Sequence, residues 1–163
     1  REATLAALAE ARATAVFVTH DAEEALLVAD RLAILKGGHL LQEAAPREAY
    51  DAPVSVDAAA ALGPVNVFSG RAENGAVATP FGRVAATRIE DGVTARVAVR
   101  AEALSLAPGA MARVRDIRPH GAHDLARIEA QGLVWSALIP ARMGLGENVD
   151  VEIQPWGAFA FSA

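Results

Sequence analysis

The chain has 163 residues, enough for one ordinary domain or two small ones, because domains usually span about 100–200 residues. Hydrophobic residues make up 53% and charged residues 21%, which supplies apolar side chains for a core and too little charge for a disordered chain. The lack of cysteine excludes disulfides, thiolate metal sites and cysteine nucleophiles, and no apolar run approaches the roughly 20 residues that span a bilayer. We therefore expect a folded, cytoplasmic protein.

The charge is acidic and unevenly distributed along the chain. The net charge is −5; residues 1–63 hold five Lys/Arg against ten Asp/Glu, whereas residues 64–163 hold ten of each. Neither part offers the basic surface that nucleic-acid binding usually requires, so we expect no nucleic-acid partner. Lys36 is the only lysine and Gly37 follows it, so the sequence contains no phosphate-binding P-loop, which needs Ser or Thr after the lysine.

The first predicted elements are a helix, a short strand and a second helix. Residues 2–12 are good helix formers with apolar side chains at helical spacing. Residues 15–18 form an apolar run typical of a strand buried on both faces of a parallel sheet, with His20 at its carboxyl end. Asp21 is a suitable N-cap and Glu24 follows three residues later, as in a capping box, which predicts a helix over 22–29.

The next predicted elements are a hairpin and two short helices. Residues 31–36 and 39–43 are expected to be strands joined by a tight turn at Gly37-Gly38. Residues 46–50 and 55–62 are short helical stretches, separated by a break at Pro53. Gly63-Pro64 marks a domain boundary, so residues 1–63 are expected to form an α/β unit.

The remaining hundred residues are richer in turn residues. They contain ten Gly and six Pro, against three Gly and two Pro in residues 1–63. Short strands punctuated in this way suggest a small barrel, in which closure removes exposed edges. The predicted strands are 66–72, 94–99, 112–117, 125–130, 134–139 and 149–153.

Two stretches carry a resemblance to a known family. VFVTHDAEEALLVADRLAILKGGHLLQ, residues 16–42, resembles the H-loop region of ABC transporter ATPases. GPVNVFSGRAENG (63–75) and VAVRAEALSL (97–106) resemble the TOBE-type regulatory domain that follows the ATPase domain in ABC importers. DIRPHG (116–121) and the ending EIQPWGAFAF are most similar to sulfate/thiosulfate importers, within a branch that also holds iron and polyamine importers. One departure is Ala101, where the family usually has proline between Arg and Glu or His.

The resemblance implies a fold and a function. The fold class is then α+β, with residues 1–63 the C-terminal α/β remnant of an ABC nucleotide-binding domain and residues 64–163 an OB-like β-barrel. The intact parent would be a transport-coupled ATPase that binds ATP and Mg²⁺ and imports an inorganic anion such as sulfate/thiosulfate. This chain lacks the Walker A, Q-loop, signature, Walker B and D-loop segments. We therefore expect no ATPase activity and no bound ATP or Mg²⁺ for the chain by itself. The implied partners are a second copy and membrane permeases, which would hold the subunit at the inner face of the cell membrane.

His20 is the predicted site residue. Ligands on open α/β sheets bind outside the carboxyl ends of strands, and an imidazole can both donate and accept hydrogen bonds at neutral pH. The resemblance implies that His20 is the switch histidine, which contacts the γ-phosphate of ATP in the intact parent. The alternative is a histidine that only caps a turn. For Asp21 and Glu24, helix capping is favoured over acid/base chemistry.

Two further groups suggest weaker alternatives. His120 and His123 have a spacing compatible with one metal ion, but further ligands are missing, so a loop is favoured. Arg113, Arg115 and Arg118 alternate on one strand and could meet an oxyanion, although pairing with Asp116 and Glu129 on a solvated face is favoured. The alternative functions are accordingly a free-standing oxyanion or metal sensor built on the barrel, and a structural dimerisation module.

Overall fold

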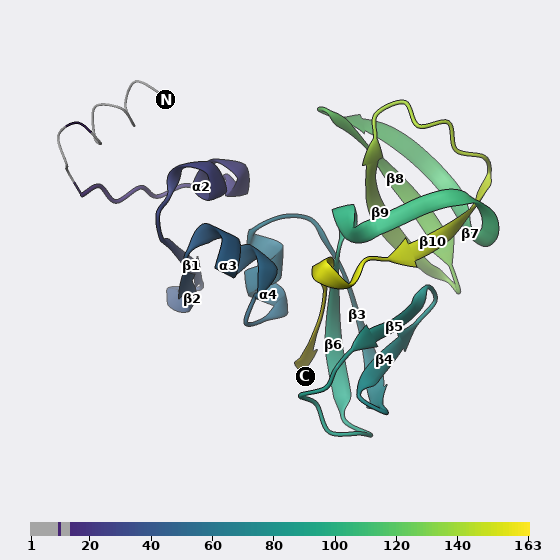
Figure 1. Cartoon of the computed structure of the whole chain (residues 1–163), viewed down its shortest axis with the longest axis horizontal. Helices are drawn as coiled ribbons and strands as arrows, with labels where there is room; N and C mark the ends of the chain where they lie inside the picture. Colours follow the sequence, from purple (N-terminus) through teal and green to yellow (C-terminus); the bar gives the residue numbers. More distant parts are fainter. Residues whose placement is uncertain (1–9, 11–13) are drawn as a thin grey trace.

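The computed structural model describes residue 10 and residues 14–163. Figure 1 shows a small N-terminal part of helices and one hairpin beside a larger part made of β-strands. The helix predicted for residues 2–12 lies, apart from Glu10, outside the described residues. The described chain is mostly β with few helices, which confirms the predicted fold class.

The N-terminal part follows the predicted elements closely from residue 21 onward. Helix α2 spans Ala22–Val28, strands β1 (Leu32–Lys36) and β2 (His39–Ala44) form the hairpin, and helices α3 (Pro46–Asp51) and α4 (Val56–Ala61) follow. The hairpin turn places Gly37 and Gly38 at φ 57° and 80°, a region that favours glycine. These elements share a small apolar core of Leu32, Ile34, Ala44, Ala49, Ala58 and Leu62.

The strand predicted for residues 15–18 is wrong for this structure. Residues 14–19 have no regular secondary structure, and Val16 and Val18 are 90% and 96% exposed. An apolar β-branched run becomes a strand only when a neighbouring strand pairs with its backbone groups. Among the described residues no strand pairs with residues 15–18. The next strands in the chain, β1 and β2, form a two-stranded sheet by themselves.

The larger part contains two antiparallel sheets. The strand order is β11-β6-β3-β4-β5 in the five-stranded sheet and β10-β7-β8-β9 in the four-stranded sheet. Two 3₁₀ turns, η1 (Ala101–Ala103) and η2 (Pro155–Gly157), follow β6 and β10. The strands are β3 Val65–Glu73, β4 Ala76–Thr79, β5 Gly82–Ala85, β6 Thr94–Arg100, β7 Leu104–His120, β8 His123–Ala130, β9 Leu133–Pro140, β10 Asn148–Ile153 and β11 Ala158–Ser162.

The core of this part lies between the two sheets, which curl around it (Figure 1). Trp135 on β9 is 2% exposed and packs against the rings of Phe68 and Phe81, with centroids 5.2 Å and 5.0 Å away. Burial of such a large aromatic group is a main source of stability in a domain of this size.

Asn66 on β3 joins the two sheets through its side-chain amide. Its Nδ2 donates to the carbonyl of Ser136 at 2.9 Å and to that of Val99 at 3.3 Å, and its Oδ1 accepts from the Ser136 N–H at 2.7 Å. Ser136 belongs to β9, the edge strand of the four-stranded sheet. The amide therefore takes the place of a neighbouring strand at this edge.

The β-strands also differ from the prediction in detail. The strand expected at 112–117 is part of β7, which runs for 17 residues, and β4, β5 and β11 were not predicted. Strands β4 and β5 have four residues each and are rich in Ala and Gly, so their apolar signal is weak. Among the described residues, no helix combines the length and apolar character needed to cross a membrane.

Candidate functional site

His20 lies at a bend directly before α2, and its side chain is exposed. The Asp21 N–H donates to Thr19 Oγ1 at 3.0 Å, and the Asp21 carboxylate accepts from the Glu24 N–H at 3.0 Å. The predicted N-cap is therefore confirmed, while the Asp21 N–H is bonded to Thr19 rather than to the Glu24 side chain that a capping box requires. Short-range hydrogen bonds thus fix the backbone directly after His20, whose side chain is exposed.

Helix α2 has no buried residue of its own, yet it is packed on the N-terminal core. Ala25, Leu26 and Ala29 face that core as partly buried side chains, and Tyr50 of α3 belongs to the same cluster. The position of α2, and with it the turn that carries His20, therefore depends on how this cluster is held.

Arg100, the last residue of β6, is the most unusual side chain of the structure because it is charged and 0% exposed. Its Cζ lies 3.7 Å from the centroid of the Tyr50 ring, and its Nη2 donates to the Tyr50 carbonyl at 2.8 Å. Its Nη1 donates to the Ala59 carbonyl at 3.4 Å. Burial lowers the pKa of Arg100 to about 10, opposed by the charge of Asp51, so the guanidinium stays charged at neutral pH.

Glu102, in η1, completes this arrangement. The Tyr50 hydroxyl donates to Glu102 Oε1, so the same tyrosine contacts Arg100 with its ring and carbonyl and Glu102 with its hydroxyl. Burial raises the pKa of the Glu102 carboxyl. Between them, Ala101 donates its N–H to the Pro64 carbonyl at 3.0 Å, a bond that a proline at this position could not make.

This group of Tyr50, Arg100 and Glu102, which we call the junction cluster, joins the N-terminal part to the β-rich part. Sequence reasoning missed it. One signal was available: Arg100 ends the apolar run VAV of residues 97–99, where a solvated charge is not expected. Its partner Tyr50, however, lies 50 positions away in the chain and carries no signal of its own.

Two polar contacts stiffen the N-terminal part beside the junction cluster. The buried Gln42 side chain donates to the Ala52 carbonyl and accepts from the Val54 N–H, both at 3.1 Å. Lys36 Nζ lies 2.7 Å from the Asp57 carboxylate, and this hydrogen bond lowers the pKa of Asp57. The loop between α3 and α4 is therefore tied to the hairpin.

The arginines of β7 are mostly paired with carboxylates. Arg115 is 2.8 Å from Glu129, and Arg118 is 3.2 Å from Asp116. Arg127 of β8 pairs with the same Asp116, and these bonds lower the pKa of the Asp116 carboxyl. The predicted solvated face with Asp116 and Glu129 is confirmed, whereas the paired guanidinium groups offer little positive charge to a free oxyanion.

His120 and His123 face each other across the turn between β7 and β8. Both are exposed, and Gly121 takes φ 64° in the turn. Within the described residues no group of three or more His, Cys, Asp or Glu side chains could hold a metal ion. The spacing of the two histidines is therefore explained by a hairpin.

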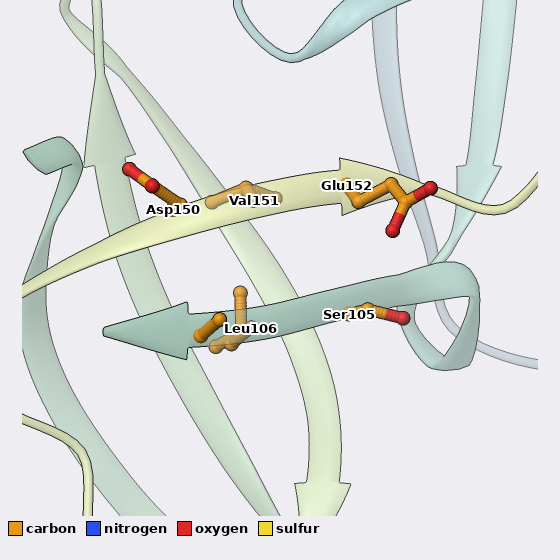
Figure 2. A pocket seen from close by; sticks show the side chains of 6 residues that line it. Ser105, Leu106, Asp150, Val151 and Glu152 are labelled. Atoms are coloured by element: carbon orange, nitrogen blue, oxygen red, sulfur yellow. The ribbon is translucent and has the colours of Figure 1, made fainter. Parts of the chain in front are cut away.

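A surface pocket lies over the paired strands β7 and β10, as Figure 2 shows. The Asp150 side chain stands at one end, and Glu152 and Ser105 stand at the other (Figure 2). Asp150 Oδ1 already accepts from the N–H groups of Ala110 (2.8 Å) and Met111 (3.2 Å), so it holds the bulge of β7. The Asp150 carboxylate therefore has a structural explanation.

Comparisons with known proteins give relatives for most of the chain. No family profile matches this sequence. The Fe(3+) ions import ATP-binding protein FbpC 1 of Rhodococcus jostii is 34% identical over 157 residues, covering 90% of this chain and 45% of the relative. The spermidine/putrescine import ATP-binding protein PotA of Pasteurella multocida is 39% identical over 84 residues, covering 52% of this chain and 20% of the relative. A molybdate-bound structure of the molybdate-binding protein ModG gives a TM-score of 0.47 at 14% identity, covering 60% of this chain and 96% of that protein.

The chain is homologous to a region of the ATP-binding subunits of ABC importers. It spans less than half the length of these relatives, 45% in the first case and 20% in the second. The relatives are named for ferric iron and polyamine import, and they do not single out the sulfate branch that the sequence motifs favoured.

Proposed function

We propose that the chain is the part of an ABC importer's ATP-hydrolysing subunit that carries the switch histidine and the regulatory β domain. One observation carries this proposal: the alignment with FbpC 1 covers 90% of the chain at 34% identity. The position of His20, exposed and bracketed by the Thr19 and Asp21 hydrogen bonds, supports the role that the resemblance implies.

ATP and Mg²⁺ would belong to the intact subunit. ATP supplies the phosphoanhydride bond whose hydrolysis is coupled to transport. Of the residues described here, His20 fits a contact with the γ-phosphate, because its imidazole is exposed and can donate a hydrogen bond to a phosphate oxygen. The capped α2 helix holds the backbone of this residue in place. The sequence itself supplies no phosphate cradle, since its only lysine, Lys36, is paired with Asp57.

The cargo is proposed from the names of the relatives. Ferric iron is favoured over sulfate, since the alignment that covers 90% of the chain is to an Fe(3+) import protein. The partners that we propose are membrane permeases, together with a second copy of the subunit. The location that follows is the cytoplasmic face of the membrane, reached through the permeases.

The test is His20→Ala in the longer protein to which this chain belongs. We expect ATP binding to be retained and kcat to fall by about 10²–10³, the usual cost of removing one preorganised transition-state contact. His39→Ala is the matched control, because His39 is also exposed but lies in the hairpin strand β2. If His20→Ala kept near-normal turnover, the switch role would not apply to this sequence.

A further inference from the structure

The junction cluster is built so that one tyrosine is held on three sides. The guanidinium of Arg100 covers the Tyr50 ring at 3.7 Å and binds the Tyr50 carbonyl at 2.8 Å. Glu102 binds the Tyr50 hydroxyl. Since the guanidinium is planar and its donors have fixed directions, these bonds restrict the orientation of α3 relative to β6 and not only its distance.

Other contacts between the two parts lack this directionality. Val56 and Ala59 of α4 form a small apolar cluster with Ala98 of β6, and Val65 and Phe161 pack at its edge. Apolar contact of this kind is non-directional and allows sliding. Joined domains usually move relative to one another unless a large interface prevents it. A fixed orientation here therefore needs the directional bonds of Arg100.

The packing continues from Tyr50 toward the turn of His20. Tyr50 lies in the same apolar cluster as Ala25 and Leu26 of α2, and α2 begins at Asp21, the residue after His20. A shift of α3 on the β-rich part would therefore carry α2 and His20 with it.

We propose that Arg100 is a positioning residue: by clamping Tyr50 together with Glu102, it fixes the orientation of the His20 turn relative to the β-rich part. The clamp itself follows from the observed contacts. An effect of this clamp on ATP turnover rests on the proposed function, because it requires that His20 contacts the γ-phosphate of ATP. The β-rich part can then influence His20 although no residue of β6 lies near it in sequence.

The experiment measures distances between spin labels in the chain of 163 residues. The chain has no native cysteine, so label pairs can be introduced without removing any. Glu23→Cys on α2 with Glu90→Cys before β6 reports the orientation across the junction. Glu23→Cys with Glu48→Cys on α3 reports the N-terminal part alone. All three glutamates are exposed.

Arg100→Met is the test variant, because methionine fills much of the same space without the guanidinium. We expect the Glu23/Glu90 distance distribution to widen about twofold or more, as for two parts that move independently, while the Glu23/Glu48 distribution keeps its width. Arg96→Met is the matched control: it is the same substitution on the same strand, at an exposed position. We expect it to leave both distributions unchanged.

An unchanged Glu23/Glu90 distribution in Arg100→Met would overturn the proposal. If Arg100→Met widens both distributions, the N-terminal part has lost its fold, and Arg100→Lys then decides. Lysine keeps the positive charge but lacks the planar guanidinium and its fixed hydrogen-bond donors. We therefore expect Arg100→Lys to widen the Glu23/Glu90 distribution and to leave the Glu23/Glu48 distribution unchanged. A Glu23/Glu90 distribution of wild-type width would refute the clamp. These distances do not depend on ATP hydrolysis, so failure of the clamp and failure of the proposed function remain distinguishable.

Discussion

Replacing Asn66 by alanine should destabilise the β-rich part more than the substitution of a half-buried polar residue usually does. The change removes the hydrogen bonds to Ser136 N–H and C=O at 2.7 Å and 2.9 Å and the weaker one to Val99 at 3.3 Å. A net hydrogen bond contributes about 1 kcal/mol, and a buried group left unpaired costs about 1–3 kcal/mol. Because Ser136 is only half-buried and water can reach it, we expect a total loss of about 2–3 kcal/mol.

The assay is urea unfolding followed by tryptophan emission. Trp135 is buried between the sheets, whereas Trp156 is 50% exposed, so Trp156→Phe in all variants isolates the buried reporter. Asn148→Ala is the matched control, since Asn148 is exposed at the start of β10, and we expect a loss within about 0.5 kcal/mol. If Asn66→Ala unfolded at the same urea concentration as this control, the amide would not be replacing a neighbouring strand.

Three further predictions concern other residues. Gly109→Ala should lower the free energy of unfolding, measured in urea, by about 1–2 kcal/mol. The reason is that a Cβ at this position would overlap the Asp150 carboxylate, which binds the β7 bulge. An unchanged urea midpoint would show that the bulge adapts freely. Burial raises the pKa of Glu102 above 4.5, so its contribution to stability is fully present below pH 4.5 and is lost as the pH rises through the raised value. Urea unfolding across this pH range should show the decline in the wild type and a smaller one in Glu102→Gln, and equal declines would rule out Glu102 as its source. Light scattering at equal concentration should give a higher association state for residues 1–163 than for 64–163, because exposed apolar, unpaired backbone at 16–18 recruits other chains; a monomeric longer chain would contradict this.

The elements that the sequence predicted well are those fixed by neighbours in the chain. Asp21 caps α2 through a residue three positions on, and Ser55 caps α4 in the same way at 3.1 Å. The Gly37-Gly38 turn sets the hairpin by its own backbone preference. In each case the interaction spans fewer than five residues, so the local pattern contains it.

The elements that the sequence could not predict depend on distant partners. Residues 15–18 have the composition of a buried strand, but composition does not reveal whether another strand pairs with them. Strand β5 has four residues and owes its existence to pairing with β4, in which Val77 is buried opposite Val84. Such pairing is a property of the fold and not of the segment.

The candidate site shows the same division within one functional unit. His20 could be proposed from the sequence, because its neighbours and the capped helix form a local motif, and its role stays a prediction. Arg100 could not be assigned a partner, since its acceptors Tyr50 and Ala59 lie 50 and 41 positions earlier. Hydrogen bonds offset the cost of burying a guanidinium, and the fold brings these two carbonyls to Nη2 and Nη1, while Nε has no hydrogen-bond partner among the described residues. The residue proposed to contact a ligand is thus defined by a local pattern, while the residue proposed to orient it depends on distant partners, and mutational tests of this protein should include both.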